Sequence, residues 1–387
     1  PIYKTKYSDA SDLISAEFES VIQHEQRRLQ YYENHSMGYI NIMKLLYLNA
    51  LTGYYDPHSM YFNPELNKWF QGKVSASNFS FGFTLEEDLN GNIKISTLLP
   101  GGPAWKSNSI HKGDILISGQ WHGSEKQDFT LLSLDEIEFF LEQSVDKPFI
   151  LEIKKPNGQT IEVDLKKEQV KEDEDIVHSY ILEDKHKCGY IILPSFYTDY
   201  DETINGCSND VAREIMKLKK EGIEGLILDL RFNGGGSIQE ALDLGGIFID
   251  AGPICMVADN TGKAVSLKDR NRGTVWDGPL IIMVNAYSAS ASEILSAALQ
   301  DYNRALIVGQ KTYGKASGQV VMPLDTSIMQ DLSNLEFNKK ADAYIKLTNF
   351  LVYRINGQSH QKTGVQPDII LPSFEKYNTA NDEPYPL

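Results

Sequence analysis

The sequence predicts a multidomain α/β protein, because three regions of its 387 residues differ in texture. Residues 1–73 have the apolar spacing of helices, residues 74–168 have the pattern of short strands and turns, and residues 187–373 alternate apolar runs with helical segments. A charged linker at 169–186 and a C-terminal tail at 374–387 complete the division. A chain of this length can bury more than one hydrophobic core.

The first region is predicted to be helical. Phe18, Ile22 and Leu29 are spaced for one helical face, and after the first residue no proline precedes Pro57. The region ends in the turn-like sequence YYDPHS at 54–59.

The second region is predicted to be a compact β-rich unit. Its apolar runs are short and are separated by turns such as Asn90-Gly91-Asn92 and Pro156-Asn157-Gly158. A short helix is expected from Ala104 and a longer one over 133–141.

The third region is predicted to contain a mostly parallel sheet with helices. Its continuous apolar runs are typical of strands that are buried on both faces, and helices are expected between them near 208–220, 237–247 and 290–300. The apolar runs are Tyr190–Leu193, Leu226–Leu230, Leu280–Val284 and Leu306–Val308.

Composition excludes several classes of function. The apolar share of 41% is ordinary for a globular protein, and the net charge of -16 argues against a broad nucleic-acid interface, which needs a basic face. No apolar run approaches the ~18 residues of a membrane helix. Because the sequence starts at Pro1 without a methionine, we expect a trimmed form from which any targeting segment has been removed.

The cysteines indicate neither a disulfide framework nor a zinc site. There are three of them, Cys188, Cys207 and Cys255, with no C-x-x-C pair among them, and the sequence has no H-E-x-x-H motif. We therefore expect no metal and no cofactor.

The segment GQKTYGKAS, residues 309–317, almost matches a phosphate-binding loop. Gly314 and Lys315 fit that pattern, but Ala316 stands where a magnesium-binding hydroxyl is required. A phosphate loop must also open a helix, whereas residues 319–323 have the pattern of a strand. The loop therefore does not predict a nucleotide site, and Lys315 is either a surface lysine or has another role.

Two further loops combine structural and chemical signals. The loop NGGGS at 233–237 joins a strand to a helix, but Gln239 stands where a dinucleotide fingerprint needs its third glycine. It is either a tight turn or a set of N–H groups that face an anion. Ser290-x-x-Glu293, in the run SASASE, is a capping box. The start of a helix also stabilises negative charge, so the cap does not exclude chemistry.

Several long motifs lie in order along nearly the whole chain. They are YYDPHSMYF, GYIILPSF, LILDLRFNGGG, SASASEILSAALQDYNRALIVGQKTYGKASGQ and, at 364–368, GVQPD. Together they resemble the S41 family of C-terminal processing (tail-specific) peptidases. The resemblance implies a ClpP/crotonase-like β/α catalytic core, a PDZ-like β-rich insert at 74–168 and a helical N-terminal region.

The resemblance assigns a catalytic dyad. Ser290, the middle serine of the run SASASE, is the implied nucleophile, and Lys315, 25 residues later, is the implied general base. Gln319 matches the position that orients the lysine. Ala316 replaces the glycine that commonly follows the lysine, which affects the local backbone only.

The resemblance also implies supporting residues. Gly235, Gly236 and Ala291 match the backbone donors of an oxyanion hole. Asp301 matches an acidic position, and we expect it to give structural support.

A lysine base must lose its charge before it can act. Lysine has a pKa of ~10.4 in water, and burial can lower it to roughly 7–8, a change that corresponds to about 4 kcal/mol. Histidine is the obvious competing base, and His58 in the turn Asp56-Pro57-His58 is the alternative candidate.

The PDZ-like region is expected to recognise a chain terminus. Ser80-Phe81-Gly82-Phe83 resembles the family's Gly-Φ-Gly-Φ carboxylate-binding loop, in which Φ is an apolar residue, although Ser80 replaces the first glycine. The alternative is a β-rich structural insert.

The sequence therefore predicts a serine endopeptidase that cuts polypeptides near C-terminal tails, located in the bacterial cell envelope, in the periplasm. The alternative function is an inactive S41-like module that binds a peptide or a hydrophobic ligand. The physiological substrate and the oligomeric state stay open, as does whether the PDZ-like region delivers the substrate or gates the site.

Overall fold

The computed structural model describes residues 22, 26, 29, 32, 38–64, 66–67, 70, 78–88, 91–130, 132–142, 144, 146–170, 177–198, 206–269, 272–325 and 341–372. The chain divides into two compact units. The first unit comprises residues 1–51, 61–69 and 79–170, and the second comprises 52–60, 70–78 and 171–387. Within the described ranges, every helix is too short or too polar to cross a bilayer.

The N-terminal part of the described chain is helical, as predicted. Helix α2 (Tyr39–Tyr55) buries Ile42 and Leu45 and is followed by strand β1 (Met60–Phe62). Ile22 and Leu29 are helical but exposed, so the face predicted from their spacing is not a buried one, and Phe18 lies outside the described residues.

The first unit is built on an antiparallel sheet of order β3-β4-β5-β7-β8, with β6 paired to β5 and β2 paired to β9. Trp121 and Phe149 lie in its core with ring centroids 4.7 Å apart, and the Trp121 indole N–H donates to the Phe140 carbonyl. The strands are β2 (Asn78–Ser80), β3 (Phe83–Glu87), β4 (Ile93–Leu98), β5 (Ile115–Trp121), β6 (Gln127–Asp128), β7 (Phe149–Lys154), β8 (Thr160–Leu165) and β9 (Glu168–Val170), and the helices are α4 (Pro103–Lys106) and α5 (Leu134–Glu142).

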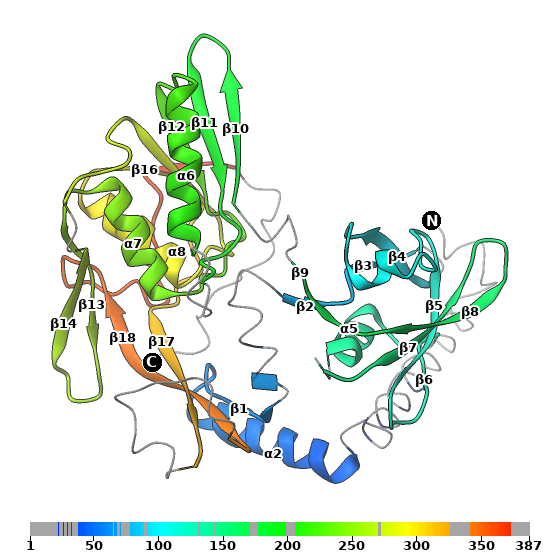
Figure 1. Cartoon of the computed structure of the whole chain (residues 1–387). Helices are drawn as coiled ribbons and strands as arrows, with labels where there is room; N and C mark the ends of the chain where they lie inside the picture. The colour runs from blue at the N-terminus through cyan, green and yellow to red at the C-terminus, as the bar shows by residue number, and fades with distance from the viewer. Residues whose placement is uncertain are drawn as a thin grey trace, which may run out of the picture. The chain divides into compact units, whose positions relative to one another are not determined.

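The second unit contains the predicted parallel sheet. Its strand order is β10-β11-β12-β15-β16-β19, and every neighbouring pair is parallel except β10 with β11. Helices α6 (Cys207–Lys220), α7 (Ile238–Phe248) and α8 (Ala291–Asp301) lie side by side with α7 in the middle (Figure 1). Helix α6 packs against β10 and β11, and α8 packs against β16. The strands are β10 (His178–Glu183), β11 (Lys187–Ile192), β12 (Gly225–Asp229), β15 (Leu280–Val284), β16 (Leu306–Gly309) and β19 (Ile369–Ile370).

A second, antiparallel sheet of the same unit carries β17 (Ser317–Pro323) and β18 (Tyr344–Tyr353), which pair with each other. Strand β13 (Gly252–Ala258) pairs with β18 and with β14 (Ala264–Asp269). Because β17 directly follows the loop GQKTYGKAS, that loop opens a strand and not a helix. The α/β fold class is confirmed, and the phosphate-loop pattern is a coincidence of sequence.

Candidate active site

Ser290 lies in a strained turn between β15 and α8. Its φ of 56° places a non-glycine residue in the left-handed region, which costs free energy and often marks functional sites. Its N–H donates to Glu293 Oε2 at 2.8 Å, which is the Glu293 half of the predicted capping box. The start of α8 therefore holds Ser290 in one orientation.

The other two serines of the run SASASE serve the scaffold. The Ser288 hydroxyl donates to the Leu230 carbonyl at 2.8 Å, and the Ser292 hydroxyl donates to the Asn233 carbonyl at 2.9 Å. Both side chains are completely buried, whereas Ser290 is only half-buried. Of the three, only Ser290 is accessible to solvent.

The glycine loop lies against Ser290 because β12 and β15 are parallel neighbours, and their carboxyl ends lie at the same edge of the sheet. A Cβ atom on Gly235 would lie 2.8 Å from Ser290 Cβ, and one on Gly236 would lie 2.4 Å from the Phe196 carbonyl oxygen. Both glycines also have a positive φ, so no other residue fits without strain.

The hydrogen bonds of the loop show which of the predicted oxyanion-hole N–H groups already have an acceptor. The Gly235 N–H donates to Asn233 Oδ1 at 2.9 Å and is already used. Among the described residues, no protein acceptor receives the N–H of Gly236 or of Ala291. Gly236 and Ala291 are therefore the better candidates.

The Glu293 carboxylate joins the serine turn to the lysine turn. Besides the Ser290 N–H, it accepts hydrogen bonds from the Thr312 hydroxyl at 2.6 Å, the Gly314 N–H at 2.8 Å and the Lys315 N–H at 2.9 Å. Burial raises the pKa of Glu293 to about 7, and the hydrogen bonds oppose that rise. The capping motif was visible in the sequence, but its partners in the lysine turn were not.

Gln319 lies beside the Lys315 amine. Lys315 Nζ donates to Gln319 Oε1 at 2.8 Å. The amide nitrogen of Gln319 donates to Ser317 Oγ and to Thr348 Oγ1, both at 3.0 Å, which turns the amide oxygen toward the amine. Thr348 was not identified from the sequence, since it lies on β18, 29 residues from Gln319.

His58, the alternative base, lies in a turn that Asp56 closes. Asp56 accepts the His58 N–H at 3.2 Å and the Ser59 hydroxyl at 2.7 Å. Asp56 also hydrogen-bonds Thr348, and with the other bonds this lowers its pKa against the opposing effect of burial. Hydrogen bonds through Thr348 and Gln319 thus connect the His58 turn to Lys315.

Asp301, the last residue of α8, forms a bidentate ion pair with Arg354. Arg354 Nη2 lies 2.6 Å from Asp301 Oδ1, and Arg354 Nε lies 3.0 Å from Oδ2. Both side chains are largely buried. The pair ties the end of α8 to the end of β18, which is the geometry of a supporting residue.

In the first unit, the predicted carboxylate-binding loop is partly occupied by its own contacts. The Gly82 N–H donates to Ser80 Oγ at 2.9 Å, and the Phe81 side chain is buried in the core of the unit. Phe83 begins β3, which is an edge strand of the described sheet and lies beside α5. The buried Lys167 ammonium lies 5.6 Å from the centroid of the Phe81 ring, a neighbour that the sequence did not indicate.

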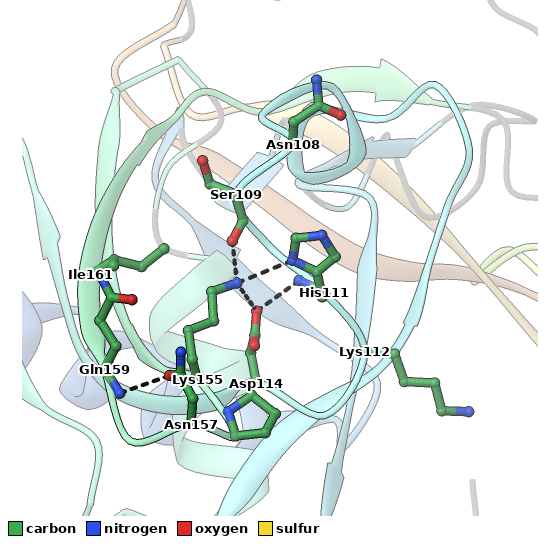
Figure 2. A pocket seen from close by; sticks show the side chains of 10 residues that line it. Asn108, Ser109, His111, Lys112, Asp114, Lys155, Asn157, Gln159 and Ile161 are labelled. Atoms are coloured by element: carbon green, nitrogen blue, oxygen red, sulfur yellow. Dashed lines mark hydrogen bonds and ion pairs between the residues drawn. The ribbon is translucent and has the colours of Figure 1, made fainter.

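A separate cavity of about 560 Å³ lies in the first unit, and none of the predicted site residues lines it. Figure 2 shows Lys155 at its centre, with Nζ 2.7 Å from Asp114 Oδ2 and 3.1 Å from His111 Nδ1. Asp114 Oδ2 also accepts the His111 N–H at 2.7 Å. These groups bond to one another, so the cluster stabilises the local turn.

The chain is similar in sequence to known peptidases. Residues 187–371 match the family model described as Peptidase family S41. The chain is 33% identical over 331 residues to the tail-specific protease of Haemophilus influenzae, covering 85% of this chain and 46% of that protein. It is 28% identical over 345 residues to the carboxy-terminal-processing protease of Bartonella bacilliformis, covering 85% and 70% respectively.

The chain thus spans about half the length of the first of these relatives. Among solved structures, it is similar to a photosystem II D1 C-terminal processing protease at 21% identity and a TM-score of 0.49, covering 91% of this chain and 93% of that one.

Proposed function

The chain belongs to peptidase family S41, and we propose that it is a serine endopeptidase that hydrolyses peptide bonds of protein substrates. Ser290 is the nucleophile and Lys315 is the general base. The observation that carries the proposal is that the Glu293 carboxylate accepts hydrogen bonds from the backbone N–H of both Ser290 and Lys315. Gln319 Oε1, 2.8 Å from Lys315 Nζ, additionally holds the lysine amine.

Each residue then has one task. Lys315 in its neutral form takes the proton of Ser290 Oγ as the oxygen attacks the substrate carbonyl carbon. The N–H groups of Gly236 and Ala291, at the positive end of α8, stabilise the oxyanion. Lys315 returns the proton to the leaving amine, and water then hydrolyses the acyl-enzyme with the lysine again as base.

Residues 74–168 act as a PDZ-like domain that binds the C-terminal tail of the substrate. An extended tail pairs with the edge strand β3, and its terminal carboxylate is attracted to Lys167. Burial lowers the pKa of Lys167 to about 8, and a bound carboxylate favours its charged form.

The wider assignment follows the family. The second unit is a ClpP/crotonase-like catalytic core, and the enzyme works in the bacterial envelope, in the periplasm. Support for the catalytic unit comes from its parallel sheet with the site at the carboxyl ends of β12 and β15. Support for the location comes from the bacterial relatives alone.

Digestion of casein by the wild type and by three serine variants tests the proposal. Ser290→Ala should lose at least about 10⁴-fold of the rate, since removal of a serine nucleophile can cost on the order of 10⁶-fold. Ser288→Ala and Ser292→Ala are matched controls, which lose a buried scaffold hydrogen bond but should keep much of the rate per folded molecule. If the wild type binds casein without cutting it, the chain is instead the inactive binding module.

A further inference from the structure

Phe232 combines backbone strain with solvent exposure. It precedes the glycine loop, and its φ of 64° places a bulky residue in the left-handed region that favours glycine. Its side chain is nonetheless 64% exposed. A strained residue is normally retained because its side chain is needed, and burial in a core does not explain this one.

One buried amide holds Phe232 and a second aromatic residue in place. Asn285 Oδ1 accepts the Phe232 N–H at 2.9 Å and the Tyr287 N–H at 3.1 Å. Asn285 is itself buried, and its backbone N–H donates to the Ser288 hydroxyl at 2.9 Å. The same element that positions the serine turn therefore positions both aromatic residues.

The two rings form a stacked pair, which we name the aromatic platform. The ring centroids of Phe232 and Tyr287 are 5.5 Å apart and the ring planes are 22° apart. Stacking restricts each ring, so the platform presents a fixed apolar surface and a substrate does not have to order it.

The platform lies close to the nucleophile along both of its chain segments. Tyr287 precedes Ser290 by three residues, so at most about 10 Å of chain separates them. Phe232 adjoins Asn233, whose carbonyl accepts the Ala289 N–H at 3.0 Å, and the loop continues to Gly235 against Ser290. A polypeptide held at Ser290 has its neighbouring side chains within reach of the platform.

We infer that the aromatic platform is a substrate subsite that holds a large apolar side chain within two residues of the cut bond. The inference rests on the proposed function. An aromatic or long aliphatic side chain buries surface on the two rings, whereas a small or charged one gains nothing there. The enzyme therefore selects cut sites by apolar side chains as well as by the C-terminal tail.

The variant Phe232→Gly tests whether the Phe232 ring binds substrate or only stabilises the fold. Glycine adopts a φ of 64° without strain, so this variant should unfold at the wild-type temperature or above while it lacks the ring. Phe232→Tyr keeps the ring and should restore wild-type behaviour. Tyr180→Ala is the matched control, since Tyr180 is 52% exposed, lies beside the tilted ring of Tyr190 and belongs to β10 of the same unit.

The readout is a map of cut bonds in unfolded casein by mass spectrometry, followed by kcat/KM for peptide pairs with Phe or Ala beside the cut bond. We expect the wild type and Tyr180→Ala to prefer Phe, and Phe232→Gly to lose about tenfold of that preference, as when one apolar contact is removed from a specificity site. An unchanged preference in Phe232→Gly, or no apolar preference in the wild type, overturns the subsite alone. No cleavage by the wild type refutes the proposed function and the subsite with it.

Discussion

The burial of His360 makes the stability of the second unit depend on pH. Its side chain is almost completely buried. Burial and the nearby charge of Arg354 lower the pKa of His360 from 6.5 to about 4, and the backbone of Lys315 partly opposes that shift. The folded protein therefore keeps this imidazole neutral at pH values where the unfolded chain takes up a proton.

The size of the effect follows from the two pKa values. The interval between 6.5 and about 4 corresponds to about 3 kcal/mol, at about 1.36 kcal/mol per pH unit. Because the unfolded state binds the extra proton, this stability is fully present above pH 6.5 and is lost as the pH falls toward 4.

Glu293 has an effect of the opposite sign. Burial raises its pKa from 4.5 to about 7, so the folded state binds the extra proton and its stability is lost as the pH rises from 4.5 toward 7. The two contributions are of similar size and overlap. The wild-type curve alone would therefore understate both of them.

His360→Leu isolates the histidine contribution. Leucine cannot take up a proton, and the His360 carbonyl bond to the Gly364 N–H does not involve the side chain. Urea unfolding between pH 4 and pH 7.5, followed by fluorescence, should give a difference in unfolding free energy between wild type and variant that grows by about 3 kcal/mol toward neutral pH. Gln358→Leu, at an exposed position two residues away with no titratable group, is the control and should give a flat difference. A flat difference for His360→Leu would refute the reasoning.

Two further predictions concern lysines. Lys315→Arg should be nearly as inactive as Lys315→Ala in the casein assay, because a guanidinium cannot act as a base, and retained activity would leave Lys315 only a fixed charge. Lys167→Met should raise KM about fivefold for a peptide with a free C-terminal carboxylate but not for its amidated form, as expected from loss of a charge-assisted contact, while Lys166→Met at the exposed neighbouring position should not. In the wild type, the preference for the free carboxylate should fade as the pH rises through about 8, where Lys167 loses its charge, and a preference independent of pH would contradict this role.

The elements of the second unit could be predicted because their sequence signals are local. Strands such as Leu280–Val284 are continuous apolar runs, and a strand buried on both faces requires that pattern wherever it lies in the sheet. The start of α8 was equally visible, since a capping box needs only Ser290 and Glu293.

The contacts that complete the site could not be predicted, because they join segments that are distant in sequence. Nothing near Thr348 indicates that its hydroxyl will accept from Gln319, and nothing near Lys167 indicates the Phe81 ring. The exposure of Leu29 has a related cause. Helical spacing indicates which residues share a face but not whether another segment covers that face.

The run SASASE shows why scaffold and site cannot be separated here. Ser288 and Ser292 are both completely buried, and both bond carbonyl groups at the carboxyl end of β12, so they fix the serine turn to the glycine loop from either side of Ser290. The residue between two such anchors has little freedom to relax, which accounts for its left-handed backbone. In the proposed mechanism, that strain orients Ser290 before a substrate arrives. The conformational cost is then met by folding and not by each catalytic cycle.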